Sequence, residues 1–173
     1  MRVSDYIIHE LEKHTRHVFT LVGGGSMHLN DALYDSNITP VFCLHEQGAS
    51  MAAMTYAQLT GFGVCMVTSG PGATNAITGC LQAWMDSAPV LFISGNVPTY
   101  NMAKNGERYV GPQECDIISM VTGITKYATQ IQKGEKGWAI KTMLNSAIRE
   151  TQQPRQGPAW LDIPLDIQGA EIE

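Results

Sequence analysis

Short apolar runs alternate with helical patterns along this chain, and this alternation restricts the fold more than any other feature. The runs 64–68 and 90–93 are too short for buried helices and are rich in β-branched or aromatic residues. Between them, Ile77, Leu81 and Trp84 recur at helical spacing. Strands separated by helices form parallel sheets covered on both faces. We therefore expect an α/β fold, a three-layer sandwich around a mostly parallel sheet, as one domain over residues 1–173.

The same patterns predict the individual elements. Expected strands cover 18–22, 41–44, 64–68, 89–95, 125–131 and 159–163. Expected helices are one capped by Ser4, one over 26–33, one over 47–60 that Gly61 stops, and two more over 73–84 and 138–151. The segment 96–115 contains two glycines and two prolines, so we expect a long irregular loop there.

Charge and cysteine content exclude several classes of protein. The net charge is -5 without a basic run, which argues against nucleic acid or an anionic membrane as the main partner. No apolar run approaches the roughly 18 residues of a membrane span. There are four cysteines, Cys43, Cys65, Cys80 and Cys115, which lie far apart and form no metal or redox motif. We therefore expect free thiols and a cytoplasmic location.

The stretch 41–48 carries a carboxylate at an informative position. We interpret residues 41–44 as a buried inner strand that runs directly into Glu46, followed by a helix whose first turns have little side-chain bulk. Acidic residues are common in the first turn of a helix, where they meet the positive end of its dipole. Alternatively, Glu46 is an acid/base group, because ligands of open α/β sheets bind beyond the strand ends.

Two glycine-rich turns follow predicted strands, but neither has the spacing of a common nucleotide site. The turn 23–25 is followed by His28, and the turn 70–72 by Asn75, where the fingerprint G-x-G-x-x-G requires its third glycine. Neither turn continues into the Gly-Lys-Ser/Thr of a P-loop. Each turn can simply reverse the chain. A nucleotide-binding Rossmann-like module therefore stays an alternative without support from spacing.

Taken together, residues 45–49 and 68–75 resemble the pyrimidine-binding domain of thiamine diphosphate-dependent enzymes, most closely the acetolactate synthase group. The likeness continues in the family's order through 86–90, 95–98, 113–116, 125–127, 157–158 and 162–168. It thus covers nearly the whole chain. The resemblance implies the fold already expected from the strand and helix patterns.

The resemblance also implies residue roles. The family's matching glutamate, here Glu46, hydrogen-bonds N1′ of the cofactor's aminopyrimidine and so prepares the cofactor as a nucleophile. Gln113 matches a glutamine that reaches the active site from the long loop, although Pro112 stands where the family usually has Phe. Lys126 matches a lysine near the substrate entrance, or is a solvated strand residue. The residues matched to cofactor binding are Glu46, Gly24, Gly25, Gly70, Pro71 and Asn75.

The family's Gly-Asp-Gly…Asn motif for the diphosphate and Mg²⁺ does not occur in this sequence. By resemblance, this chain holds half of an active site and no metal site, and the central and diphosphate-binding domains are absent. We expect thiamine diphosphate to bind between this domain and a diphosphate-binding partner that carries Mg²⁺, in a homo-oligomer, with FAD dependence left open. The expected substrate is a 2-oxo acid, for carboligation or decarboxylation, and the chain alone is expected to be inactive.

Two explanations fit the extent of the chain. It can be the small subunit of a split 2-oxo acid decarboxylase, as in sulfopyruvate decarboxylases, or the first domain of a longer enzyme, which the likeness to full-length enzymes favours. A non-catalytic interaction subunit is a further alternative, against which the retained Glu46 argues.

Overall fold

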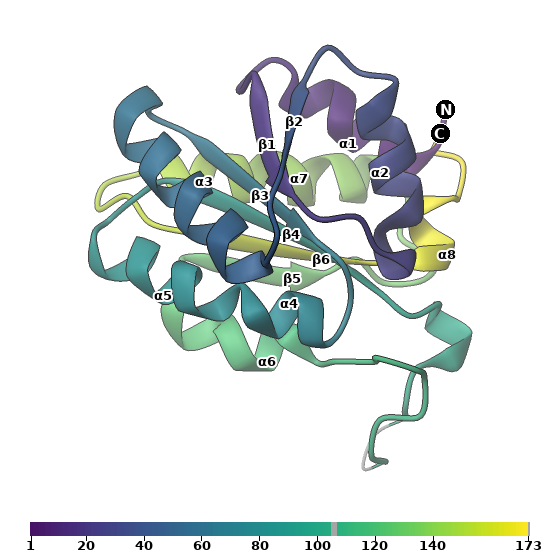
Figure 1. Cartoon of the computed structure of the whole chain (residues 1–173). Coiled ribbons are helices and arrows are strands. Elements are labelled where there is room, and N and C mark those ends of the chain that lie inside the picture. The colour runs from purple at the N-terminus through teal and green to yellow at the C-terminus, as the bar shows by residue number, and fades with distance from the viewer. Residues whose placement is uncertain (105–106, 173) are drawn as a thin grey trace.

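The strands lie side by side in one sheet, and helices cover both of its faces (Figure 1). A computed structural model describes residues 1–104 and 107–172. Within these residues the strand order is β2-β1-β3-β4-β6-β5, and every neighbouring pair is parallel. The predicted three-layer α/β sandwich is therefore confirmed. The strands are β1 (His17–Thr20), β2 (Thr39–Phe42), β3 (Gly63–Val67), β4 (Val90–Asn96), β5 (Tyr127–Gln130) and β6 (Ala159–Pro164).

The helices form the two outer layers, each with its own apolar core against the sheet. One layer consists of α1 (Val3–Leu11), α2 (Met27–Tyr34), α7 (Gly137–Gln152) and α8 (Leu165–Gln168). The other consists of α3 (Glu46–Thr60), α4 (Pro71–Asn75), α5 (Ile77–Met85) and α6 (Ile117–Val121). Short 3-10 turns are η1 (Gly24–Ser26), η2 (Thr99–Asn101) and η3 (Thr122–Ile124). Predicted strand ends agree with the observed ones within two residues.

The prediction that 41–44 is a buried inner strand was wrong. β2 is an edge strand that pairs only with β1, and it ends at Phe42. Phe42 is 64% exposed and Leu44 is fully exposed. Pro40 lies within β2 and has no N–H for a second neighbour, which suits an edge position. This apolar edge strand therefore leaves a surface that the described residues do not cover.

The helix predicted over 73–84 is two helices. α4 already begins at Pro71, and the chain turns at Ala76 before α5 starts. Gly79 in α5 packs against α3, because a Cβ there would lie 2.2 Å from Oγ of Ser50. The close approach of these helices explains the interior glycine. The predicted helix stop at Gly61 is confirmed, since this C-cap residue has a φ of 91°.

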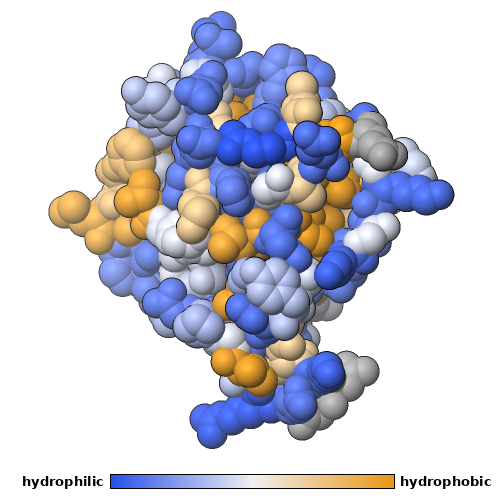
Figure 2. Space-filling model, turned by 90° about the vertical axis from the view of Figure 1, so that its right-hand side faces the viewer, coloured by the Kyte–Doolittle hydropathy of each residue, from blue (hydrophilic) through white to orange (hydrophobic). Residues whose placement is uncertain are grey.

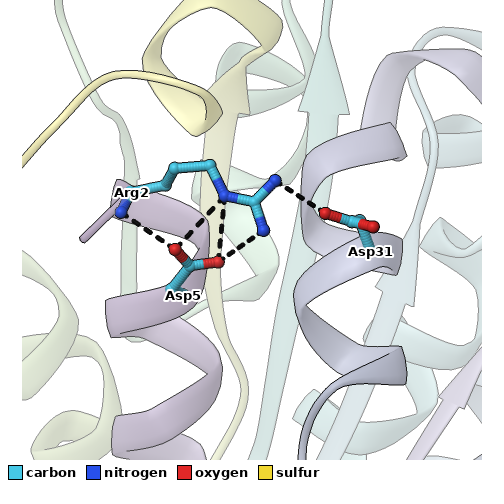
Figure 3. Close-up of polar contacts among 3 residues, drawn as sticks. All are labelled: Arg2, Asp5 and Asp31. Atoms are coloured by element: carbon cyan, nitrogen blue, oxygen red, sulfur yellow. Dashed lines mark hydrogen bonds and ion pairs between the residues drawn. The ribbon is translucent and has the colours of Figure 1, made fainter.

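The first helix begins two residues earlier than predicted, with Arg2 as its N-cap, and Ser4 is buried inside it rather than capping it. Asp5 accepts from the backbone N–H of Arg2 over 2.9 Å and from its guanidinium over 2.6 Å (Figure 3). The same guanidinium donates to Asp31 of α2 over 2.6 Å (Figure 3). The Arg2 side chain lowers the pKa of Asp5 and joins the two helices at the N-terminal end.

The two chain ends lie side by side (Figure 1). The backbone N–H of Val3 donates to the carbonyl of Ala170 over 2.8 Å, and that of Ile172 donates to Met1 over 3.0 Å. All four cysteines are free, as predicted, and three of them are buried: Cys65, Cys80 and Cys115. Among the helices of the described residues, none is long and apolar enough to cross a membrane.

Candidate functional site

Glu46 is the first residue of α3 and lies beyond the end of β2. Its N-cap residue, His45, accepts at Nδ1 from the backbone N–H of Gln47 over 3.1 Å. The Glu46 side chain is half-buried, and its Oε2 accepts from Nδ2 of Asn75 over 3.0 Å. Asn75 is the last residue of α4, which follows β3. The fold therefore brings two of the predicted site residues into direct contact.

The turn after β1 lies between these two strand ends, because β1 separates β2 from β3 in the sheet. A Cβ on Gly23 would lie 2.4 Å from Cβ of Thr68, and one on Gly25 would lie 2.5 Å from Oγ of Ser69. The N–H of Gly25 also donates to Oγ1 of Thr68 over 3.1 Å. By contrast, a Cβ on Gly24 would meet no described atom within 4 Å. The two glycine-rich turns thus pack together and leave Gly24 open.

Gln168 holds the same turn from the other face of the sheet. This side chain is fully buried, and its Nε2 donates to the carbonyls of Gly25 and Ile163, each over 2.7 Å. A Cβ on Gly95 would lie 1.9 Å from that Gly25 carbonyl, so a glycine is required there. Only its place in the shared motif 162–168 singled out Gln168 in the sequence, because the contact spans 143 residues.

The turn that starts α4 packs against the side chain of Glu46. Pro71 occupies the first helical position, where its fixed φ and missing N–H suit a helix start. A Cβ on Gly72 would lie 2.6 Å from Cγ2 of Thr68 and 3.3 Å from Oε1 of Glu46. Gly72 therefore leaves the space in which the carboxylate lies, although sequence reasoning did not select it.

Gln113 reaches this cluster through its backbone. A Cβ on Gly70 would lie 2.4 Å from the carbonyl oxygen of Gln113. Both residues have a positive φ, 55° at Gly70 and 62° at Gln113. The side chain of Gln113 is exposed. The structure thus places the long loop against the turn after β3, next to the helix that carries Asn75.

A family model described as "Thiamine pyrophosphate enzyme, N-terminal TPP binding domain" matches residues 1–120 of this chain. The chain belongs to this family. The matched range contains the residues predicted for catalysis and cofactor binding, while Lys126 lies outside it.

Curated relatives are similar to nearly the whole TPP-binding domain. It is 38% identical to acetolactate synthase isozyme 2 large subunit of Escherichia coli K12, over 97% of the chain and 30% of that protein. It is 37% identical to a probable acetolactate synthase large subunit of Methanocaldococcus jannaschii, over 100% of the chain and 28% of that protein. It is also 38% identical to acetolactate synthase 2, chloroplastic, of Nicotiana tabacum, over 95% of the chain and 24% of that protein. The chain spans less than a third of these relatives.

In this TPP-binding domain, Glu114 fixes the loop next to Gln113. Burial raises the pKa of Glu114, but three backbone N–H donors outweigh it and the pKa is lowered. The donors are Ala103, Val110 and Gly111, at 2.7, 2.8 and 2.9 Å. The carboxylate of Glu114 therefore joins its own part of the loop to residue 103 and to residues 110–111.

A hollow of about 720 Å³ lies beneath this loop and not at Glu46. Its walls include Asn96, Tyr109, Cys115 and Gln130. A cofactor held between two domains meets only one wall on each of them. An open carboxylate beside bare glycine backbone therefore fits such a site better than an enclosed cavity does.

Lys126 does not join the cluster around Glu46. It precedes β5, at the amino ends of the parallel strands, and its Nζ donates to the carbonyl of Gln153 over 2.6 Å. Within residues 1–104 and 107–172, no three His, Cys, Asp or Glu side chains are grouped as metal ligands.

Proposed function

We propose that this chain is the pyrimidine-binding domain of a thiamine diphosphate-dependent enzyme that acts on 2-oxo acids, with acetolactate synthase-like carboligation or decarboxylation. The observation that carries the proposal is the contact between Glu46 and Asn75 beside open glycine backbone. The names of the relatives, acetolactate synthases, support the substrate class.

The residues present fit the pyrimidine end of the cofactor. A carboxylate can exchange a proton with a ring nitrogen, and Glu46 offers one at a strand end. A Cβ on Gly24 or Gly48 would meet no described atom within 4 Å, so a flat ring can approach the backbone at both positions. In this proposal Glu46, Gly24, Gly25, Gly70, Pro71 and Asn75 hold the pyrimidine.

When bound, thiamine diphosphate supplies the electron sink for making or breaking a carbon–carbon bond next to a carbonyl. Glu46 holds and moves a proton at the pyrimidine nitrogen. Oε2 of Glu46 already accepts a hydrogen bond from Asn75, so we assign the proton exchange to Oε1. Gly72 has no Cβ that would crowd Oε1. In this proposal Gln113, whose backbone packs against Gly70, contacts the substrate with its exposed side chain.

The diphosphate and its Mg²⁺ are proposed to bind on a partner domain, of the same chain or of a second one, in a homo-oligomer located in the cytoplasm. Exposed apolar side chains near these strand ends support a partner there. Val22 follows β1, Phe42 ends β2, and Leu44 lies two residues before Glu46. Figure 2 views the molecule from the side of η2 and α8, and it shows apolar surface in the middle of this face and at its left rim.

Calorimetric titration tests the proposal. Thiamine diphosphate with Mg²⁺ is added to this chain alone, and then to this chain assembled with a diphosphate-binding domain. We expect weak binding to the chain alone, and tight binding with 2-oxo acid turnover in the assembly. Binding and turnover that do not change in the variant Glu46→Gln would refute the proposal.

A further inference from the structure

Asp162 is a fully buried carboxylate in the middle of β6, on the face covered by α6. It accepts three side-chain hydrogen bonds: from Oγ of Ser94 over 2.6 Å, from Nδ2 of Asn96 over 2.7 Å and from Nε2 of Gln130 over 2.7 Å. Ser94 in turn accepts from Nε1 of Trp160 over 2.9 Å. The donors come from β4, β5 and β6, three adjacent strands of the sheet.

Asn96 connects this carboxylate to both ends of the loop 97–115. Its Nδ2 carries two hydrogens, of which one goes to Asp162 and the other to the carbonyl of Cys115 over 2.8 Å. Its Oδ1 accepts from the N–H of Val97 over 2.9 Å. Val97 starts the loop and Cys115 ends it. One buried side chain therefore forms hydrogen bonds with both the first and the last residue of the loop.

Asp162 determines the orientation of the Asn96 amide. A carboxylate oxygen can only accept, so the NH₂ group must face Asp162. If the amide were reversed, two oxygens would face each other in a buried site, and Cys115 would lose its donor. The buried charge thus selects the one amide orientation that holds Cys115.

Cys115 lies two residues beyond Gln113, whose carbonyl packs on Gly70. Between them, Glu114 accepts from the N–H groups of Ala103 and Gly111. The returning part of the loop is therefore held at Gln113 by the turn after β3 and at Cys115 by Asn96. The hydrogen bonds of Asn96 go to Asp162, Cys115 and Val97, and not to Glu46 or Asn75.

We infer that Asn96, oriented by Asp162, is the positioning residue that sets Gln113 toward the substrate. The inference rests on the proposed function and goes beyond it, because it assigns a role to two buried side chains that do not reach the cofactor. Small displacements of a substrate-contacting group cost about tenfold to 100-fold in turnover. Because the proposed cofactor binding depends on Glu46, we expect changes at Asn96 to leave the affinity for thiamine diphosphate unchanged.

The test compares Asn96→Ala and Asn96→Leu with Ser94→Ala in the enzyme assembled with its diphosphate-binding domain. Ser94→Ala removes a bond to Asp162 and leaves the bonds of Asn96 in place, so it is the matched control. For the Asn96 variants we expect kcat to fall about tenfold or more, with the dissociation constant of thiamine diphosphate within about twofold of the wild type. For Ser94→Ala we expect both values to stay within about twofold.

Amide hydrogen exchange of this chain gives a second measurement that does not depend on catalysis. We expect the amides of residues 107–115 to exchange faster in the Asn96 variants and to keep their protection in Ser94→Ala. Asp162→Asn retains an acceptor for Asn96 and should protect the loop, whereas Asp162→Leu should not. Asn96→Leu keeps the branched shape of the side chain without its hydrogen bonds, so it is the second variant to measure if Asn96→Ala does not fold.

Unchanged kcat and unchanged exchange in folded Asn96 variants would overturn the inference. A loss of cofactor affinity as large as the loss of turnover would do so too. These outcomes differ from failure of the proposed function, for which Glu46→Gln is the indicator. If Glu46→Gln abolishes turnover and the Asn96 variants do not reduce it, only the positioning role is wrong.

Discussion

Asn75 donates from Nδ2 to Oε2 of Glu46 over 3.0 Å, although 29 residues separate them in the sequence. The contact joins the ends of β2 and β3, which are not neighbours in the sheet. The turn after β1, with the open backbone of Gly24, lies between them. Three consecutive connections of the fold therefore meet where the cofactor is proposed to bind.

Glu46→Gln tests the proton-transfer role. In the assembled enzyme we expect turnover to fall by about 10² to 10⁴, the usual contribution of a general acid or base. Steady-state kinetics measures the loss. Glu150→Gln, on α7 in the opposite helical layer, is the matched control and should leave turnover unchanged. A loss below about threefold in Glu46→Gln would contradict the assignment.

Asn75→Ala tests the hydrogen bond to Glu46. Because both side chains are partly exposed, we expect a loss of about 1 kcal/mol, or roughly fivefold in affinity for thiamine diphosphate. Asn75→Asp should bind more weakly still, since it places a second carboxylate against Glu46. Calorimetry of the assembled enzyme ranks the variants. Equal affinity for the wild type and both variants would show that the contact has no role in binding.

Gly70→Ala and Gly24→Ala should separate stability from function. Gly70 has a positive φ and lies against the Gln113 carbonyl, so we expect Gly70→Ala to cost about 1–3 kcal/mol in urea unfolding. Gly24→Ala meets open space and should change stability by less than about 0.5 kcal/mol, while it weakens cofactor binding. Gly123, which is equally open and lies in η3, provides the control. The reverse order of stabilities would contradict this reading.

Asp162 predicts a pH dependence of stability. Burial raises its pKa to about 6 from 3.8 against the opposing effect of its hydrogen bonds. The folded protein therefore binds this proton more tightly than the unfolded chain does. The contribution of this group to stability is full below pH 3.8 and is lost as the pH rises through 6, in total about 3 kcal/mol.

Asp162→Asn removes this titration. The difference in unfolding free energy between the variant and the wild type should therefore change between about pH 4 and 6 and be constant above that range. Urea unfolding at a series of pH values measures it. A difference that does not vary with pH would show that the pKa of Asp162 is not raised.

Local sequence patterns were sufficient to predict the layers of the fold and most element boundaries, because burial periodicity is a local property. The position of β2 was not predictable in this way. An apolar strand has the same composition in the middle of a sheet and at its edge, and Phe42 is exposed because none of the described residues covers it. Ser4 was misassigned as a cap because Asp5 bonds the backbone of Arg2 instead.

The predicted site residues lie in one neighbourhood, but several of the contacts that hold them were invisible in the sequence. Gln168 binds the Gly25 carbonyl, and Gly72 leaves space for Glu46. Asp162 and Asn96 belong to shared motifs without any spacing that predicts their bond. Each of these contacts depends on which strands become neighbours, and the strand order follows from packing of the whole chain.

The hydrogen bonds of Val3 with Ala170 and of Ile172 with Met1 make the connectivity of this fold almost cyclic. Joining Met1 to Ile172 through a short linker, and opening the chain in the exposed turn around Gly134, would keep every strand pairing. Circularly permuted versions of this fold are therefore sterically accessible. For the same reason, a protein segment joined to either end would emerge on the same side of the molecule, beside α8.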